Sequence, residues 1–170
     1  MLLVFESRRL DRFLLARHVE RGWELPGGHV EPGEKPVEGA RREWEEETGL
    51  PLSCLEQVAR HTRGDGSMGH LFLGAVRDQS EGSAVKLVGA VDPRGRIIDQ
   101  KWVRRLDEVA PLAFPGDPYD SLAKAVARRA DTGDWRLPEG EDPQGFIRRV
   151  SQHPEAKPRG DPVEILEGTP

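Results

Sequence analysis

Carboxylates dominate the chemistry of one stretch of the sequence, residues 28 to 50. Glu43, Glu46 and Glu47 follow Arg42 within a few residues. On a helix, at about 100° per residue, these three glutamates share one arc. Like charges three and four residues apart repel by about 0.2 to 0.5 kcal/mol per pair, so a cation is expected to offset them. Because oxygen-only ligands favour Mg²⁺ or Mn²⁺ over zinc, the stretch predicts a divalent-metal site.

The element that positions these glutamates is a helix predicted over residues 36 to 48. Pro36 suits the first turn of a helix, and Gly49 suits its end. Glu45 is expected to point away from the acidic arc into solvent. The apolar residues on a neighbouring arc are expected to face the core, and they are Val37, Ala40 and Trp44. The acidic arc then lies at the edge of the buried face, where a site belongs.

The spacing of the whole stretch is specific. Gly28 and Glu34 are separated by five residues, and seven residues separate Glu34 from Arg42-Glu43. The pattern then continues with an apolar residue and any residue before Glu46-Glu47. It ends with any residue, Gly49 and an apolar residue. Chance would fill this register with a probability on the order of 10⁻⁷. With Trp23-Glu24-Leu25-Pro26-Gly27 before it, the stretch closely resembles the signature of the Nudix hydrolases.

The resemblance implies a loop-helix-loop that holds Mg²⁺ and hydrolyses a phosphoanhydride in a nucleoside diphosphate linked to another group. One of the glutamates, or a metal-bound hydroxide, would act as the base. By position, the resemblance implies that Glu43, Glu46 and Glu47 are metal ligands and that Gly28 adds its carbonyl. Arg42 would orient the ligand carboxylates, and Glu34 would tie the loop to the helix.

Three positions depart from the family pattern. Trp44 is bulkier than the usual aliphatic residue, and Lys35 replaces the usual Ser or Thr helix cap. Some relatives supply a fourth acidic ligand from a loop before a Trp-containing strand. That loop contains only Asp92 and Asp99 here, so either a shorter aspartate or water is expected to fill the coordination position, with water preferred.

The resemblance covers about residues 1 to 130 and implies an α/β fold, the Nudix-type α/β/α sandwich around a mixed β-sheet. We expect a Nudix domain over residues 1–132 and a C-terminal extension over 133–170, partly helical or irregular. That extension is expected to be a weakly structured tail, and it could cover the site, mediate homodimer contacts or do neither. Strands are predicted over 1–5, 12–18, 54–62, 68–77, 84–91 and 97–103, and helices over 117–129 and 143–151.

Composition limits the partners. The net charge of -5 and the pI near 5.6 argue against broad binding to a nucleic-acid backbone, but they allow small nucleotides whose charge metals offset. The single cysteine, Cys54, fits a reducing compartment and is best explained as a small buried apolar residue. No apolar run approaches 18 residues, so no membrane span is expected. We expect a soluble cytoplasmic protein.

Basic residues that lead to the Pro-Gly-Gly turn are candidates for contacts with substrate phosphates. They are Arg17, His18 and Arg21, although basic residues at strand ends are often only solvated.

Residues beyond the signature predict the substrate. ADP-ribose hydrolases of the family tend to carry a proline about sixteen residues beyond it, and dinucleoside polyphosphate hydrolases a tyrosine at a similar distance. Gly66, Ser67 and Met68 occupy these positions here. The prediction is a nucleoside triphosphate pyrophosphatase, with an oxidised purine as a candidate base. An ADP-ribose or nucleotide-sugar pyrophosphatase, and a non-catalytic nucleotide-binding regulator of the same fold, are the alternatives.

Overall fold

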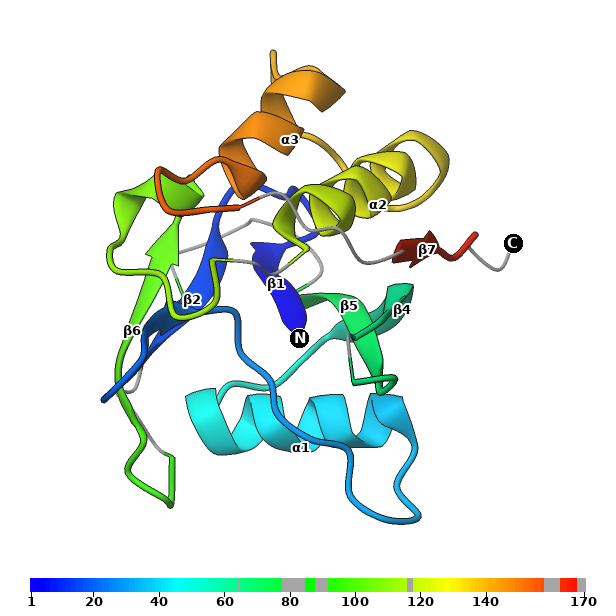
Figure 1. Cartoon of the computed structure of the whole chain (residues 1–170). Coiled ribbons are helices and arrows are strands. Elements are labelled where there is room, and N and C mark those ends of the chain that lie inside the picture. The colour runs from blue at the N-terminus through cyan, green and yellow to red at the C-terminus, as the bar shows by residue number, and fades with distance from the viewer. Residues whose placement is uncertain (64, 78–84, 88–91, 116–117, 158–162, 168–170) are drawn as a thin grey trace.

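The structure is a computed structural model, and it describes residues 1–63, 65–77, 85–87, 92–115, 118–157 and 163–167 (Figure 1). Two runs of three strands are separated by one helix, and two further helices and a last strand follow them. The elements are β1 (Leu2–Ser7), β2 (Phe13–His18), β3 (Gly22–Glu24), α1 (Pro36–Thr48), β4 (Cys54–Thr62), β5 (Met68–Arg77), β6 (Ile97–Val103), the 3₁₀ turn η1 (Leu106–Glu108), α2 (Tyr119–Thr132), α3 (Pro143–Ser151) and β7 (Val163–Ile165).

The strands form one mixed sheet. Its order is β3-β2-β1-β5-β4-β7, and β6 pairs with β2 off this path. The central pair, β1 and β5, is parallel, with Leu2 opposite Phe72, and the other pairs of strands are antiparallel. A parallel pair at the centre requires a crossover connection, and the segment containing α1 supplies part of it.

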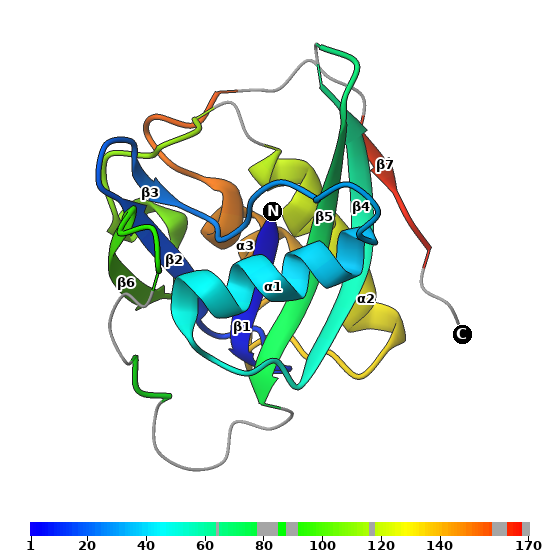
Figure 2. The same cartoon turned by 90° about the horizontal axis from the view of Figure 1, so that it is seen from below.

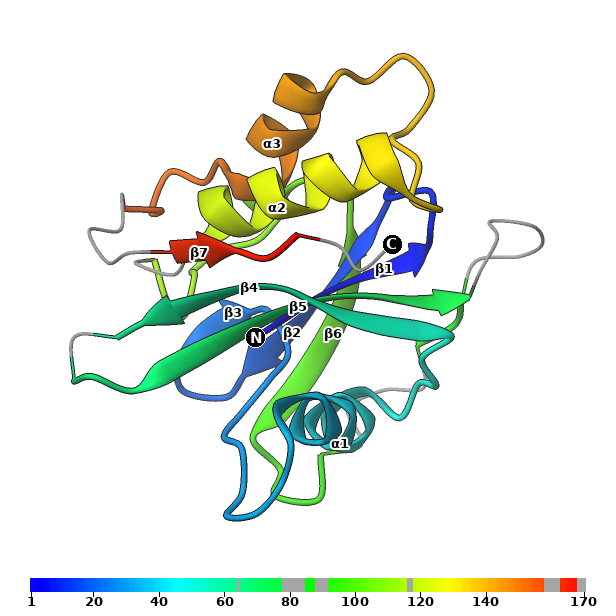
Figure 3. The same cartoon turned by 90° about the vertical axis from the view of Figure 1, so that its right-hand side faces the viewer.

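Helices cover both faces of the sheet. Seen along the sheet edge, α1 lies on one side and α2 and α3 on the other (Figure 3), and α1 runs across the strands (Figure 2). Successive residues of a strand point to opposite faces. Leu2 and Val4 of β1 accordingly pack in the core beneath α1, while Leu3 and Phe5 pack in the core beneath α2 and α3. This confirms the predicted α/β/α sandwich.

Most elements lie where the sequence predicts them, including α1 over all of residues 36 to 48. Glu45 is exposed as predicted, but Val37 is 36% exposed, so its predicted core position is wrong. The strand predicted over 84–91 is absent at residues 85–87, and its other residues lie outside the described part of the chain. The short strands β3 and β7 were not predicted, because three residues carry too little periodicity.

The segment after residue 133 is more ordered than its composition predicts. Strand β7 pairs with β4, and the apolar residues Trp135, Phe146, Ile147 and Val150 belong to the larger core. The side chain of Arg149 bonds both carboxylate oxygens of Glu141 and the main-chain oxygens of Leu10, Asp11 and Arg104, at 2.6 to 2.9 Å. A guanidinium satisfied in this way ties α3 to the turn after β1.

None of the helices described is long and apolar enough to cross a membrane.

Candidate active site

Helix α1 is fixed against the sheet by Trp44. The indole is 1% exposed, and its Nε1 donates to the main-chain oxygen of Leu50 at 2.7 Å. The helix ends at Gly49, whose φ of 66° lies in the left-handed region that glycine adopts without strain. At the other end, the Lys35 amide donates to Glu38 at 3.0 Å, so the helix begins without a Ser or Thr cap. These contacts orient the acidic arc.

The three signature glutamates differ in their surroundings. Glu43 and Glu47 are 6% and 5% exposed, and the side chain of Glu46 is 29% exposed. Burying carboxylates in this way is costly unless hydrogen bonds or cations compensate. The arc predicted from the sequence is therefore present, with its most accessible carboxylate at Glu46.

Arg42 connects the signature loop to the helix. Its Nε donates to Glu34 Oε1 at 3.0 Å, its Nη1 to Glu43 Oε1 at 2.8 Å, and its Nη2 to the main-chain oxygen of His29 at 3.0 Å. Glu46 Oε1 lies 3.6 Å from the same guanidinium. The hydrogen bond from Arg42 lowers the pKa of Glu34, which keeps that carboxylate charged. Only a planar fork of donors can satisfy partners in these three directions.

Glu47 lies in the most buried position of the arc. Burial raises the pKa of Glu47 to about 8, although a hydrogen bond from the Gly27 amide at 3.0 Å opposes the shift. The negative charges of Glu24, Glu43 and Asp92 raise it further. Gln100 of β6 donates to the main-chain oxygen of Glu47 at 2.6 Å, which joins the last turn of α1 to the sheet.

Gly28 lies against the carboxylate of Glu43. A Cβ at position 28 would come within 2.3 Å of Glu43 Cδ, so a larger residue cannot occupy this position without moving the carboxylate. The main chain of Gly28 therefore lies directly against the carboxylate of Glu43.

Glu43, Glu47 and Gly28 line a cavity of about 680 Å³. Of the basic residues proposed from the sequence, His18 and Arg21 line this cavity, whereas Arg17 is exposed on β2 and is not among the lining residues. The cavity also contains side chains that sequence reasoning missed. They are Glu24, Arg63, Arg94, Arg96 and Phe114, and they come from four separate parts of the chain, so no local pattern could have grouped them.

Arg21 is held by two side chains at the cavity wall. Its Nε and Nη2 donate to the two carboxylate oxygens of Glu24 at 3.2 and 2.8 Å, and its Nη1 lies 2.8 Å from His18 Nε2. Such a bidentate pair fixes the guanidinium in one orientation. The ring of Phe114 lies 5.3 Å from the same guanidinium.

Asp92 and Asp99 do not extend the acidic arc. The carboxylate of Asp92 accepts hydrogen bonds from the amides of Arg94, Arg96 and Ile97 at 2.7 to 3.0 Å. Asp99 is exposed on β6 and accepts from the amide of Gln100. Asp92 thus shapes the turn before β6, and neither aspartate lines the cavity.

Comparison with known proteins identifies the family. The family model of the NUDIX domain matches residues 1–125. The chain belongs to the Nudix family. This confirms the resemblance drawn from the signature.

Among curated relatives, the putative 8-oxo-dGTP diphosphatase YtkD of Bacillus subtilis is 44% identical over 50 residues, or 29% of this chain and 32% of that protein. An RNA pyrophosphohydrolase of Cereibacter sphaeroides is 41% identical over 58 residues, or 34% of this chain and 32% of that protein. The human 8-oxo-dGDP phosphatase NUDT18 is 34% identical over 103 residues, or 55% of this chain and 32% of that protein. The matched part of this Nudix chain thus spans about a third of the length of these relatives.

One solved structure that matches part of this chain is that of a mutant of the Bacillus subtilis pyrophosphohydrolase BsRppH. The two chains are 24% identical, the match covers 63% of this chain and 62% of the other, and the TM-score is 0.47.

The donors of the Nudix helix suit a divalent metal ion. They are carboxylate oxygens, with the main chain of Gly28 packed against the carboxylate of Glu43, and hard cations prefer oxygen ligands. The raised pKa of Glu47 reflects burial and excess negative charge that a cation would offset. Across the described ranges, no three His, Cys, Asp or Glu side chains already form a metal-binding cluster. The residues therefore fit a divalent cation by the type of their donor atoms and by their negative charge.

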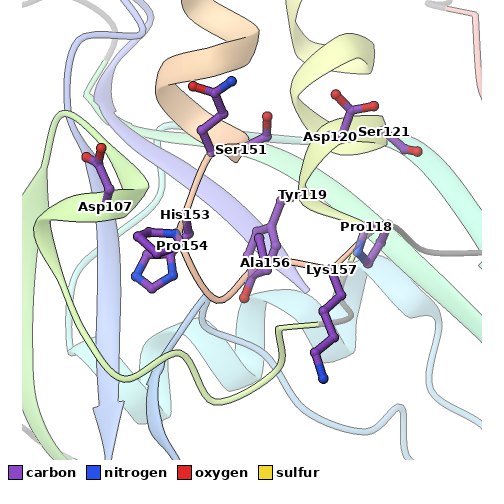
Figure 4. A pocket seen from close by; sticks show the side chains of 11 residues that line it. Asp107, Pro118, Tyr119, Asp120, Ser121, Ser151, His153, Pro154, Ala156 and Lys157 are labelled. Atoms are coloured by element: carbon purple, nitrogen blue, oxygen red, sulfur yellow. The ribbon is translucent and has the colours of Figure 1, made fainter.

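A second cavity, of about 630 Å³, lies on the opposite face of the sheet, at the N-terminal end of α2 and beside the segment after α3 (Figure 4). Both ring nitrogens of His153 in its lining are engaged. Nε2 lies 2.6 Å from the Val109 main-chain oxygen, and Nδ1 accepts from the Glu155 amide at 3.0 Å. None of the signature residues lines this cavity, so the cavity lined by Glu43 and Glu47 is the candidate active site.

Proposed function

We propose that this chain is a metal-dependent hydrolase that cleaves a phosphoanhydride bond in a nucleoside diphosphate linked to another group. The observation that carries the proposal is the shared cavity. Two buried carboxylates of α1 line it together with arginines from three separate turns, Arg21, Arg63 and the pair Arg94 and Arg96. Carboxylates that hold a cation beside guanidinium groups match the charges of a polyphosphate and its metal ions.

Glu43, Glu46, Glu47 and the carbonyl of Gly28 would hold Mg²⁺ or Mn²⁺ in this proposal. When bound, such an ion lowers the pKa of water and neutralises charge that develops on the phosphoryl oxygens. Arg42 orients Glu43 through the hydrogen bond at 2.8 Å. One of these glutamates would accept a proton from the attacking water.

The substrate we propose is a nucleoside triphosphate, cleaved to a monophosphate and pyrophosphate. The sequence lacks the proline and tyrosine marks of two other Nudix substrate classes, as Gly66, Ser67 and Met68 stand there. Two relatives with matching segments are named for oxidised guanine nucleotides, which supports an oxidised purine as the base. An ADP-ribose or nucleotide-sugar substrate is the alternative on chemical grounds.

A second candidate is the 5′-triphosphate end of RNA. The segment shared with an RNA pyrophosphohydrolase supports it, at 41% identity over 58 residues. The scissile bond and the metal chemistry would be the same. Only the group beyond the nucleoside would differ, so the two candidates can be compared in one assay.

We also propose that residues 133–170 act as an integral appendage to a Nudix domain of residues 1–132. The pairing of β7 with β4 and the hydrogen bonds of Arg149 support this proposal. Such an extension could also mediate contacts between two copies.

A substrate panel tests the proposal. The panel contains nucleoside triphosphates, 8-oxo-dGTP, ADP-ribose, a nucleotide sugar, a dinucleoside polyphosphate and a short 5′-triphosphorylated RNA. Each is incubated with Mg²⁺ or Mn²⁺, and phosphate, pyrophosphate and nucleotide products are quantified. We expect pyrophosphate and a monophosphate, with the highest kcat/KM for a triphosphate. A kcat/KM at least about tenfold higher for ADP-ribose or a nucleotide sugar would contradict the substrate assignment, and no metal-dependent turnover of any substrate would contradict the hydrolase.

A further inference from the structure

Phe114 is an exposed aromatic residue in the candidate active site. Its side chain lines the same cavity as Glu43 and Glu47, yet it is 43% exposed. Single exposed hydrophobic residues are common, but this aromatic ring lies in the lining of the cavity that contains the carboxylates, where a ligand could cover it.

The main chain holds Phe114 in place. Just before it, Trp23 of β3 donates to the main-chain oxygen of Pro111 at 2.8 Å, and Ala113 donates back to the main-chain oxygen of Trp23 at 2.9 Å. Leu112 forms a bridge with Trp23 between these bonds. The segment therefore runs along β3 like a short additional strand, and Phe114 directly follows this anchored main chain.

Gly22 allows this close approach. A Cβ there would lie 2.4 Å from the Pro111 main-chain oxygen, and its φ of 110° is one that glycine adopts readily. The segment can thus lie directly against the strand end.

Arg21 supports the ring from within the cavity. Its guanidinium carbon lies 5.3 Å from the ring centroid, and Glu24 and His18 fix its orientation. Glu24 balances the charge of Arg21, and the guanidinium packs against the Phe114 ring. Part of the ring is still exposed. An aromatic ring so placed offers a flat surface in the same cavity as the carboxylates.

We propose that Phe114 is the residue on which the nucleobase of the substrate stacks. This inference rests on the proposed function and names a residue that selects a nucleotide over a bare polyphosphate. Base–aromatic stacking is sequence-tolerant, because every base has a π-face. Phe114 therefore contributes affinity for the base, while the other arginines of the cavity, Arg63, Arg94 and Arg96, bind the phosphates.

Kinetics of Phe114→Ala and Phe114→Trp test the proposal with two substrates. One is the best nucleoside triphosphate of the panel, and the other is ribose 5-triphosphate, which has no base. Phe114→Ala is expected to raise KM for the nucleotide at least about tenfold, with kcat little changed. It should leave KM for the base-free substrate within about twofold. Phe114→Trp, which keeps an aromatic face, should retain the nucleotide KM.

Ile98→Ala is the matched control. Ile98 is 50% exposed on β6 but does not line the cavity, so both KM values should stay unchanged. An equal rise of KM for both substrates in Phe114→Ala, or no rise for either, would overturn the stacking role. Thermal unfolding of each variant identifies any loss of fold.

A binding assay separates this inference from the proposed hydrolysis. If the wild type hydrolyses nothing in the panel, the proposed function fails, and binding of an α,β-methylene nucleoside triphosphate then tests Phe114 by itself. Weaker binding to Phe114→Ala by at least about tenfold, with Ile98→Ala unchanged, supports stacking. Equal binding by all three proteins overturns it.

Discussion

Arg42 Nη1 donates to Glu43 Oε1 at 2.8 Å, and this bond links a residue that holds the signature loop to a proposed metal ligand. The same guanidinium bonds Glu34 and the main-chain oxygen of His29. Glu43 therefore has a fixed orientation before any substrate binds, and this kind of preorganisation lowers the barrier of the reaction.

Replacing Arg42 by lysine should disrupt this arrangement while keeping the charge. An ammonium group cannot bond Glu34, Glu43 and His29 in one plane. We expect kcat to fall by about 10²-fold, as a small misplacement of catalytic groups produces such losses, with KM little changed. Arg41→Lys is the control, because Arg41 is exposed at the neighbouring position. A steady-state assay in which Arg42→Lys matches the wild type would disprove the orienting role.

The signature glutamates should be essential for turnover without being essential for the fold. Glu43→Gln, Glu46→Gln and Glu47→Gln each remove a negative charge without leaving a cavity. We expect each to lower kcat/KM by at least about 10²-fold, since each removes a proposed metal ligand, and to unfold cooperatively. Glu45→Gln, on the exposed side of the helix, should behave as the wild type. The site assignment is wrong if all three variants keep full activity on the best substrate.

Without metal, the stability of the fold should fall as the pH rises from about 5 to about 8. The pKa of Glu47 is raised from 4.5 to about 8, so in this window the folded protein keeps a proton that the unfolded chain has lost. Stability decreases with pH wherever the folded state binds more protons. Each pKa unit corresponds to about 1.4 kcal/mol, so the loss is on the order of a few kcal/mol.

Thermal unfolding in EDTA at several pH values measures this effect. The wild type should lose stability across the window, Glu47→Gln should lose clearly less, and added Mg²⁺ should restore the wild type. Glu34 does not obscure the result, because Arg42 lowers the pKa of that carboxyl from 4.5 and its contribution changes only at more acidic pH. Parallel pH profiles for the wild type and Glu47→Gln would show that Glu47 is not the group that stays protonated in the folded protein.

Arg149 should contribute strongly to stability through the C-terminal segment. Its side chain is 11% exposed and bonds Glu141 and three main-chain oxygens. Arg149→Met leaves these acceptors without a donor, so we expect a loss of about 2 to 4 kcal/mol in the free energy of unfolding. Arg148→Met, at an exposed position of the same helix, is the control. Denaturant titrations in which both variants unfold alike would mean that the extension is not integral to the fold.

How far the sequence alone predicts this molecule depends on the range of the interactions. Helix α1 was predictable because Pro36, Gly49 and the repeat of glutamates are local signals. The cavity was only half predictable, because Arg63, Arg94 and Phe114 reach it from turns whose mutual distance depends on the sheet. Val37 was misplaced because helical periodicity gives a direction but not the width of the surface that the sheet covers.

The C-terminal segment shows the same limit. Its many Pro, Gly and charged residues predicted a weakly structured tail. Residues 133–157 and 163–167 are instead ordered by contacts with distant parts of the chain. Trp135 Nε1 donates to Glu56 at 2.7 Å, and β7 pairs with β4. Composition shows that the segment has few apolar residues. It does not show that these residues pack against the core formed by the rest of the chain.

The central claim is that the carboxylates of α1 hold the divalent metal that hydrolysis requires. A crystal structure with Mn²⁺ and an α,β-methylene nucleoside triphosphate tests it most directly, because anomalous scattering locates the ion independently of the protein. We predict an ion within about 2.0 to 2.3 Å of carboxylate oxygens from Glu43, Glu46 or Glu47, beside the Gly28 carbonyl and a phosphate oxygen. An ion bound elsewhere, with these three carboxylates free of metal, would contradict the account.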